Sequence, residues 1–479
     1  MNEDMLRYVV DYALSLGAEY AEARHQVDET SAMISRNGRL ITLGKSVSDG
    51  VGIRLIYKGV LTFSATNKLD KSNLIDVVKK SVDRAKALTH LIRQPAKFSG
   101  DAVGKGSYRA YMLKDFHSTA VDEKIKFLED LHKTAVNTAK EVKVPTTYCE
   151  YVEHIQKKLI LNSDGGFVRS EVPRLSITFN LVLHHGSKGT LQRLMQWGAS
   201  GGLELLQNWD PIRSLESEVT SLEKVLLHGI EPPKEPIDVI VGSEIVGLIV
   251  HESAGHPMEA DRILGREAAQ AGESYVKPDY FGNYRIGSKY ATVIEDPTIP
   301  GSYGFYEYDD ECVKARPRYL YKEGVINEPL HNRSTAYILR TTSNGSSRSM
   351  DYASEPIIRM SNTYLKPGDM GFDELIEDIN HGVYIKSYME WNIDDIRWNQ
   401  RYVGLESYLI INGELKDMIR NPVLEISTSS FYSKITGADR ELRFYPGTCG
   451  KGEPPQGMPV WFGGPNVKLS KIKLGGVGA

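Results

Sequence analysis

Cysteine is scarce in this sequence and long apolar runs are absent, and each shortage excludes a class of protein. The 479 residues include three cysteines, too few for a disulfide framework. No apolar stretch approaches the length of about 20 residues that crosses a membrane. The first residues, Met1-Asn2-Glu3-Asp4, are acidic, whereas a signal peptide starts with basic residues and continues into an apolar core. These shortages predict a cytoplasmic protein that does not enter the membrane.

An excess of positive charge is also missing. The chain has 58 basic and 62 acidic residues, a formal net charge of −4, and no long basic run. Proteins that bind DNA or RNA cluster Lys and Arg to neutralise phosphates. The composition therefore argues against nucleic acid as the main partner. The length predicts two or three domains with ample chain to bury a core.

Several familiar catalytic signatures are missing as well. There is no Walker-type phosphate loop, and Gly50-Val51-Gly52 lacks the third glycine of a dinucleotide fingerprint. Residues 198–202 fit the GxSxG of serine hydrolases, but the preceding segment lacks the apolar character of the required strand, which favours a flexible glycine loop. His184 and His185 are adjacent on an expected strand and point to opposite faces, so we expect no shared metal ion there.

The most informative motif present is His251-Glu252-Ser253-Ala254-Gly255-His256, an HExxxH one residue longer than the HExxH of many zinc peptidases. Histidines five positions apart on an ideal α-helix lie about 140° from each other and cannot share a metal ion. Gly255 favours a helix end, and Pro257 disfavours helical backbone at His256. We therefore expect the helix to stop at His256, whose ring swings back from a non-helical backbone. The alternative is a chance pairing of two histidines near a helix end.

The segment before this motif predicts a rigid support. Residues 237–241, four apolar residues and Asp238, are typical of a buried strand, Gly242 favours a turn and Ser243 is a helix-capping residue. A short apolar helix over residues 244–255 follows, with His251 and Glu252 in its last turns. Support of this kind suits a catalytic site.

A third metal ligand has one favoured candidate among the cysteines. Zinc binds Cys, His or carboxylate. Cys449 lies in the glycine-flanked loop Tyr445-Pro446-Gly447-Thr448-Cys449-Gly450-Lys451-Gly452, where small neighbours leave room for a metal and a nearby cation lowers the pKa of a thiol. Cys149 and Cys312 have the contexts of ordinary packed or surface thiols.

Two groups of carboxylates near these motifs leave alternatives open. Glu259 and Asp261 either orient the ligand imidazoles or are solvated charges after the helix, and the sequence does not separate these readings. Asp309, Asp310 and Glu311 either help to bind the amino end of a peptide or support the ligands, or form an acidic cluster on the surface. For this second group we favour the surface cluster.

Periodicity predicts an α+β protein. Helices are expected over residues 3–16, 72–88 with Ser72 as cap, and 121–142; period-two alternation predicts a strand over 175–183; and turn signals predict hairpins at Asn37-Gly38, at 321–325 and at 409–415. Three prolines in residues 229–236 indicate a connector. We thus expect an N-terminal mixed α/β region over 1–228, which allows two subdomains at about 1–115 and 116–228. A linker over 229–236 leads to a β-rich C-terminal domain, 237–479, that carries the metal-site helix.

The motifs together resemble a known family, the TldD branch of the TldD/PmbA metallopeptidases. The similar segments are HESAGHPMEAD (251–261), GTCGKG (447–452), RMSNTY (359–364), DGVGIR (49–54), DDE (309–311) and the glycine-rich end 475–479. The resemblance covers nearly the whole length and is more diffuse over about 102–228. It implies His251, His256 and Cys449 as metal ligands and Glu252 as general base. PmbA-like subunits lack HExxxH, so the motif indicates the catalytic branch.

The resemblance implies a metallopeptidase that hydrolyses unfolded or small peptides through a metal-bound water. It implies one divalent metal ion per catalytic chain, for which zinc is the first choice, although His/His/Cys also accepts iron or cobalt. It further implies a dimer, with a PmbA-like partner subunit that has no metal of its own or with a second copy of the chain. The alternative is a non-catalytic subunit or scaffold whose metal is structural. Structural zinc sites have four protein ligands, and only three are convincing here, which favours catalysis.

Overall fold

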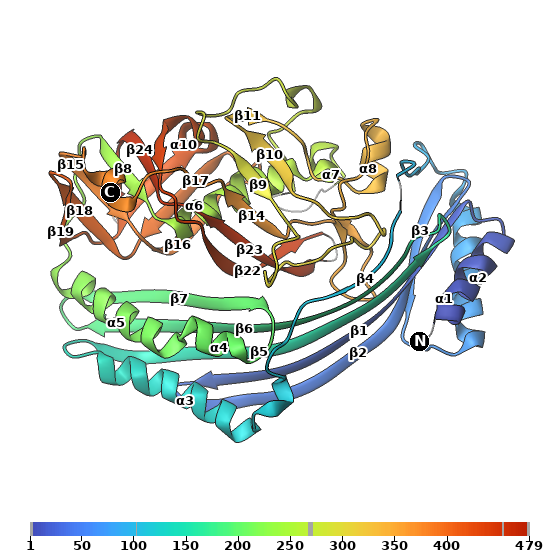
Figure 1. Cartoon of the computed structure of the whole chain (residues 1–479), viewed down its shortest axis with the longest axis horizontal. Coiled ribbons are helices and arrows are strands. Elements are labelled where there is room, and N and C mark those ends of the chain that lie inside the picture. Colours follow the sequence, from blue (N-terminus) through green and yellow to red (C-terminus); the bar gives the residue numbers. More distant parts are fainter. Residues whose placement is uncertain (1–2, 102, 267–271, 453–454, 477–479) are drawn as a thin grey trace.

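The chain forms a large curved sheet with a second, β-rich body above it (Figure 1). The computed structural model describes residues 3–101, 103–266, 272–452 and 455–476. Residues 1–2 of the acidic start and 477–479 of the glycine-rich end fall outside this range. The predicted α+β class is confirmed. Among the described residues, no helix is both long and apolar enough to cross a membrane.

The curved sheet is made by the first 200 residues. Its strands are β1 (Tyr20–Arg36), β2 (Arg39–Tyr57), β3 (Val60–Thr66), β4 (Lys105–Arg109), β5 (Lys143–Asn162), β6 (Phe167–His185) and β7 (Gly189–Ser200). They run in the order β3-β2-β1-β5-β6, and β4 and β7 pair with successive parts of the outer side of β6. The predicted Asn-Gly turn joins β1 to β2, with φ of 50° at Asn37 and 72° at Gly38. The predicted alternation over 175–183 lies within β6.

Helices cover the curved sheet near both ends. They are α1 (Glu3–Ser15), α2 (Lys71–Leu88), α3 (Val121–Thr138), α4 (Glu204–Trp209) and α5 (Pro211–His228), with the short 3₁₀ turn η1 (Phe116–Ser118) before α3. The predicted cap of α2 is wrong, because the carboxylate of Asp70 rather than Ser72 accepts from the Asn73 N–H. The end predicted at residue 142 is also wrong. The backbone N–H groups of residues 140–142 donate to Glu223 on α5 instead of continuing α3.

The second half is β-rich, as predicted. Two six-stranded sheets have the orders β11-β10-β9-β14-β23-β22 and β19-β18-β15-β8-β24-β21, beside a four-stranded sheet β16-β17-β20-β25 and the pair β12-β13. Both predicted hairpins form, β10–β11 and β18–β19. The strands are β8 (Ile237–Val241), β9 (Val293–Glu295), β10 (Arg318–Lys322), β11 (Val325–Ile326), β12 (Ser347–Arg348), β13 (Ile357–Ile358), β14 (Asn362–Leu365), β15 (His381–Ile385), β16 (Tyr388–Ile393), β17 (Asn399–Gly404), β18 (Ser407–Ile411), β19 (Glu414–Met418), β20 (Pro422–Ser427), β21 (Ile435–Ala438), β22 (Arg443–Lys451), β23 (Gln456–Gly464), β24 (Val467–Ile472) and β25 (Gly475–Gly476).

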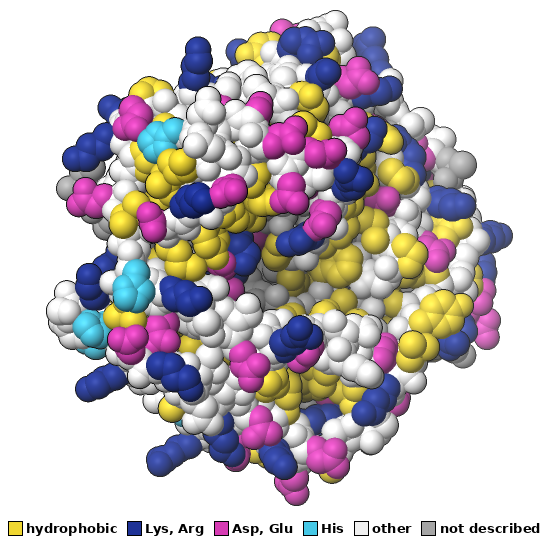
Figure 2. Space-filling model, turned by 60° about the vertical axis from the view of Figure 1, so that its left-hand side comes forward, with side chains coloured by type: hydrophobic (Ala, Val, Ile, Leu, Met, Phe, Trp, Pro, Cys, Tyr) yellow, Lys and Arg dark blue, Asp and Glu magenta, His cyan; other side chains and the backbone are white. Residues whose placement is uncertain are grey.

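Short helices connect these strands. They are α6 (Ser243–Val250), the π-turn η2 (His251–Gly255), the 3₁₀ turn η3 (His256–Met258), α7 (Ala260–Ile263), the 3₁₀ turn η4 (Pro278–Tyr280), α8 (Arg333–Ile338), α9 (Phe372–Ile376) and α10 (Thr428–Lys434). One large apolar core holds β8, α6 and the neighbouring strands together. The space-filling view shows the molecular surface hollowed near its centre, with hydrophobic side chains around the hollow (Figure 2).

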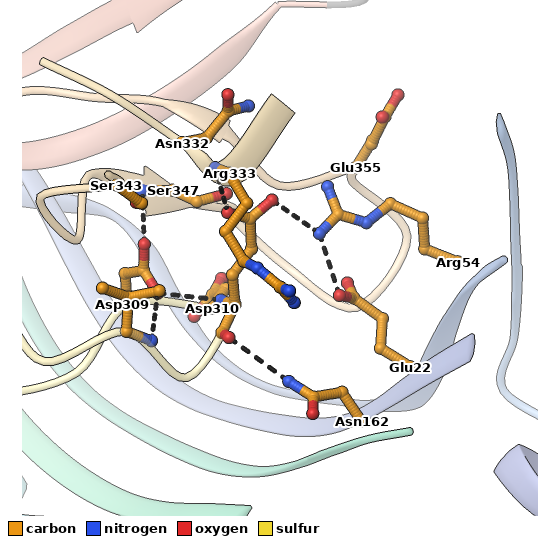
Figure 3. Close-up of polar contacts among 12 residues, drawn as sticks. Glu22, Arg54, Asn162, Asp309, Asp310, Asn332, Arg333, Ser343, Ser347 and Glu355 are labelled. Atoms are coloured by element: carbon orange, nitrogen blue, oxygen red, sulfur yellow. Dashed lines mark hydrogen bonds and ion pairs between the residues drawn. The ribbon is translucent and has the colours of Figure 1, made fainter. Parts of the chain in front are cut away.

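A buried cluster of charges joins the curved sheet to the second half (Figure 3). We name it the buried clamp, formed by Glu22, Arg24, Arg54, Lys158, Asp310 and Glu311. Arg54 lies 2.8 Å from both Glu22 and Glu311, and Lys158 lies 2.8 Å from Asp310. The favoured prediction of a surface acidic cluster at residues 309–311 is therefore wrong. These carboxylates are at most 3% exposed. Cations on the first sheet pair with Asp310 and Glu311, and backbone N–H groups donate to Asp309.

Candidate metal centre

The HExxxH motif lies at the end of the most buried helix of the second half. β8 runs between β15 and β24, and all eight residues of α6 are buried. Gly247 lets α6 approach β23, since a Cβ there would lie 2.7 Å from the backbone nitrogen of Gly463. The helix cap is Gly242 and not the predicted Ser243, whose hydroxyl lies 2.7 Å from that of Tyr445. The motif is thus anchored to β8 and β23 before its first histidine.

A π-turn, not a helix end, brings the two histidines together. The N–H of His256 donates to the carbonyl of His251, so the five residues His251–Gly255 close one widened turn. The expected non-helical backbone at His256 is wrong, because its φ and ψ are −60° and −45° despite the following proline. The widened turn puts residues five apart on one side, and the imidazole centroids lie 5.0 Å from each other.

Side chains from other segments stabilise this π-turn. The hydroxyls of Tyr275 and Tyr321 lie 2.7 and 3.1 Å from the carbonyl oxygen of Ser253, inside the turn. Gly255 has no room for a side chain, since a Cβ would lie 1.9 Å from the sulfur of Met360. These contacts satisfy a backbone carbonyl and fix the approach of the histidines.

Cys449 completes a group of three ligand atoms. It comes from β22, the last strand of its sheet, and its Sγ lies 3.4 Å from His256 Nε2. One ligand atom each from His251, His256 and Cys449 lies within 4.8 Å of the others, and all three residues are buried. Bonds of about 2.0–2.3 Å place the ligands of one tetrahedral ion about 3.5 Å apart, so a metal fits this group after small rotations. The ring nitrogen Nδ1 of His251 is buried without a hydrogen-bond partner, which is consistent with a ligand role.

Electrostatics keep these side chains in forms that bind metal. Burial lowers the pKa of both His251 and His256, which favours the neutral imidazoles. Burial alone would raise the pKa of Cys449, but the contact with His256 and the Arg359 guanidinium together lower it to about 7. Neutral imidazoles and a thiolate are the forms that ligate divalent metals.

Glu259 orients one imidazole. Its carboxylate accepts a hydrogen bond from His256 Nδ1 at 3.1 Å and from Arg262 Nε at 2.6 Å. Although burial opposes it, Lys451 and Arg262 hold the pKa of Glu259 well below its usual range. With Nδ1 engaged in this way, Nε2 of His256 faces Cys449.

Asp261 has a different task from Glu259. Its two oxygens lie 2.7 and 2.8 Å from the ammonium of Lys451, the last residue of the strand that carries Cys449. The loop predicted around Cys449 is therefore wrong, because residues 443–451 form β22 and pair with β23. The lysine that we expected to lower the thiol pKa pairs with carboxylates and fixes the end of this strand. Both Glu259 and Asp261 are buried, which argues against their reading as solvated charges.

Sequence reasoning missed the partner of Glu252. Arg397, in the turn between β16 and β17, makes an ion pair with the Glu252 carboxylate, and both side chains are buried. Arg397 has a φ of 65°, a left-handed backbone that is uncommon for arginine. No spacing signal links these two residues. Arg359, which donates to the carbonyl of Cys449, was present in the 359–364 stretch but had no assigned role.

The other candidates lie apart from this centre. His184 and His185 end β6 and contact Thr190 and Ser187. Ser200 of the GxSxG match donates to the carbonyl of Ser302. Cys149 and Cys312 are both buried free thiols, and burial raises the pKa of each. None of these residues belongs to the three-ligand group.

Comparison with sequence families gives three consecutive matches. Residues 21–88 match PmbA/TldA metallopeptidase domain 1, residues 114–220 match the central domain, and residues 234–476 match the C-terminal domain. The metal centre lies wholly in the third match.

Relatives and solved structures agree with these matches over the whole chain. A metalloprotease of Methanothermobacter thermautotrophicus is 30% identical over 96% of both chains. A zinc metalloprotease TldD homolog of Saccharolobus solfataricus is 26% identical over 98% of this chain and all of that one. TldE from Thermococcus kodakarensis shares the fold with a TM-score of 0.76 at 15% identity, covering 98% of this chain and 100% of the other. A putative modulator of a DNA gyrase from Thermotoga maritima does so with 0.75 at 17%, covering 99% and 100%.

Proposed function

Because the chain belongs to the PmbA/TldA metallopeptidase family, we propose that it hydrolyses peptide bonds with one divalent metal ion held by His251, His256 and Cys449. The observation that carries this proposal is the convergence, among the residues that the structure describes, of three buried ligand atoms, not four, beside the buried carboxylate Glu252. Three protein ligands leave a coordination position for water or substrate, the arrangement of catalytic zinc sites. Zinc is the first choice, and the name of one relative supports it.

Each neighbouring side chain has a role in the proposed reaction. A bound divalent ion supplies a Lewis acid that polarises the scissile carbonyl and lowers the pKa of a water molecule. Glu252 accepts the proton of that water and passes it to the leaving amine. Arg397 fixes the direction of the Glu252 carboxylate through its ion pair. Glu259 fixes His256, and Asp261 holds the strand of Cys449 through Lys451.

The substrate that we propose is an unfolded or small peptide. β22 carries Cys449 and ends its sheet, so an extended peptide can add to it through backbone hydrogen bonds. A cavity of about 220 Å³ lies beside it, between Gly447 and Thr448 and the first-sheet residues Glu150 and Ser176. Backbone pairing gives weak sequence preference and requires a substrate whose own backbone groups are free. We further propose that the chain acts in a dimer, with a TldE-like subunit or a second copy.

The test compares wild type with Glu252→Gln for metal content and for hydrolysis of a protein in its unfolded and folded forms. We expect about one metal ion per chain in both variants, hydrolysis of the unfolded form by wild type, and loss of at least about 100-fold in the variant. Equal hydrolysis by the variant would remove Glu252 as base. A wild type that holds metal and cleaves no unfolded peptide, alone or with a partner subunit, contradicts the proposed activity. Efficient cleavage of the folded form contradicts the substrate class.

A further inference from the structure

The cavity of about 220 Å³ beside β22 lies between that strand and the curved sheet, over which β22 runs in Figure 1. One wall is a row of side chains across three neighbouring strands. Thr178 on β6 lies opposite Glu150 on β5 and opposite Gln196 on β7, and directly opposed strand residues point to the same face. Residues 446–448 of β22 form the other wall. Glu150 is the one charged residue that lines this cavity.

The carboxylate of Glu150 is half-buried and has neither an ion pair nor a hydrogen bond within the part of the chain that the structure describes. Arg174, on the same face of β6, lies two rows away from Thr178 and donates to the carbonyl of Tyr303 instead. Carboxylates that are partly removed from water usually pair with a cation or accept hydrogen bonds. Glu150 is therefore free to pair with a positive group of a ligand.

The next row of the sheet brings β22 close to the cavity. Ser176 lies opposite Gly198 there. A Cβ at Gly198 would lie 2.8 Å from the Cβ of Pro446 and 3.4 Å from the ring of Tyr303, so this glycine lets β22 approach the sheet. Pro446 is buried and Thr448 is exposed. The cavity is thus closed beside Pro446 and open towards Thr448, the neighbour of the metal ligand in the chain.

A peptide that adds to β22 presents every second side chain to this cavity. Pro446 and Thr448 line the cavity, whereas Cys449 points to the other face of β22, towards the two histidines. An added strand has the same alternation, so its residue opposite Cys449 faces the metal ligands and its residue opposite Thr448 faces the cavity. The two residues are neighbours, about 3.3 Å apart along the strand. The cavity therefore receives a side chain close to the reacting bond.

We propose that this cavity binds a positively charged group of the peptide and that Glu150 selects it. The group is the side chain of a Lys or Arg residue or the amino end of a short peptide, since each is a cation with several N–H donors. The side-chain oxygens of Thr178 and Gln196 accept further hydrogen bonds from it. The inference deepens the proposed function and rests on it, because backbone pairing with β22 brings the peptide to the cavity.

A set of neutral, unstructured peptides with acetylated amino ends tests this selection. Each peptide contains one Lys, and its control has norleucine, an uncharged residue of similar size, at the same position. Wild type should cleave the Lys peptides with about 10-fold higher kcat/KM, and mass spectrometry should place the cleaved bond at a fixed distance from the Lys. A norleucine peptide with a free amino end shows whether that end is the group that binds. Equal kcat/KM for all of these peptides overturns the proposal.

Variants of the wall residue test its role. Glu150→Gln should remove the preference for Lys, and Glu150→Lys should reverse it in favour of peptides with Glu at the same position. Glu171→Gln is the matched control, because Glu171 is an exposed glutamate of the same sheet whose side chain points to the opposite face. This control should keep the preference. A preference for Lys that survives in Glu150→Gln overturns the assignment.

Peptide binding distinguishes this inference from the proposed hydrolysis. Fluorescence anisotropy with Glu252→Gln measures the affinity for labelled Lys and norleucine peptides without turnover. If affinity depends on the positive charge and on Glu150 while wild type cleaves no peptide, the proposed hydrolysis is wrong and the cation site stands. If wild type cleaves peptides but neither kcat/KM nor affinity responds to the charge, the hydrolysis stands and the cation site is wrong.

Discussion

The metal centre and the buried clamp are both sets of polar side chains removed from water, and they differ in how their charges are balanced. In the clamp, Arg54 lies between two carboxylates and Lys158 faces a third, so anions and cations are matched. At the centre, a thiol of pKa about 7 and two neutral imidazoles converge, and one imidazole nitrogen has no partner. Matched charges hold a structure together. Ligand atoms that converge on one point mark a place for metal chemistry.

The largest effect is expected in the clamp. Arg54→Met leaves Glu22 and Glu311 buried without their shared cation, which should lower the free energy of unfolding by about 3–5 kcal/mol. Denaturant unfolding measures this, and the metal affinity of the folded fraction should not change. Arg401→Met is the control, since its ion pair with Glu390 is exposed and should contribute less than about 1 kcal/mol. If both variants lost similar free energy of unfolding, the buried ion pairs would contribute no more to stability than an exposed pair.

The next effect concerns the ligands. Cys449→Ser replaces the thiolate with a poor zinc ligand and should weaken metal binding by at least about 100-fold, with little loss of stability in the metal-free protein. Competition with a chromogenic chelator measures the affinity. Cys149→Ser changes another buried thiol, outside the centre, and should leave the affinity unchanged. Equal metal affinity in the Cys449 variant and the wild type would contradict the assignment of Cys449 as a ligand.

A smaller effect is expected from the residue that orients His256. Glu259→Gln keeps the size of the side chain but weakens its hold on Nδ1, and metal affinity should fall by about 10-fold. The same chelator titration applies. Glu328→Gln removes a carboxylate paired with Arg316 elsewhere and serves as control. An unchanged affinity in the Glu259 variant would mean that the contact supports only the fold.

The last prediction concerns a change of metal affinity with pH. The pKa of Cys449 is lowered to about 7, so the thiolate dominates above that pH and the thiol below it. A metal ion must displace this proton in acid, so affinity should fall by about 10-fold per unit below pH 7 and level off above it. Calorimetry in buffers of different ionisation enthalpy should detect about one proton released from Cys449 at pH 6 and almost none at pH 8. Proton release that is equal at both pH values contradicts this.

Local sequence was sufficient for many elements of the fold. The strand predicted over 237–241 coincides with β8, and Asn37-Gly38 and Asn412-Gly413 form the expected turns with positive φ. The strand and the turns depend on residues that are close in the chain, so a local stretch of sequence is enough to predict them. The division at residues 229–236 stays a prediction.

Long-range contacts set the limit for the rest. His256 and Cys449 are 193 residues apart and meet because α6 packs on β23, the neighbour of β22. Arg397 reaches Glu252 from a distant turn, and cations of the first sheet bury Asp310 and Glu311. Contacts of this kind cannot be predicted from a short stretch of sequence, because the two residues meet only after the chain has folded. The π-turn was missed for a related reason, since tyrosines from other segments satisfy its carbonyl.

The π-turn also matters for how metallopeptidases are recognised in genomes. A pattern search that requires histidines at positions i and i+4 assumes an α-helix, and it passes over a chain in which the turn contains one residue more. Metal binding depends on the distances between the ligand atoms in space. Searches for uncharacterised hydrolases therefore gain from scanning structures for convergent donor atoms rather than sequences for fixed intervals.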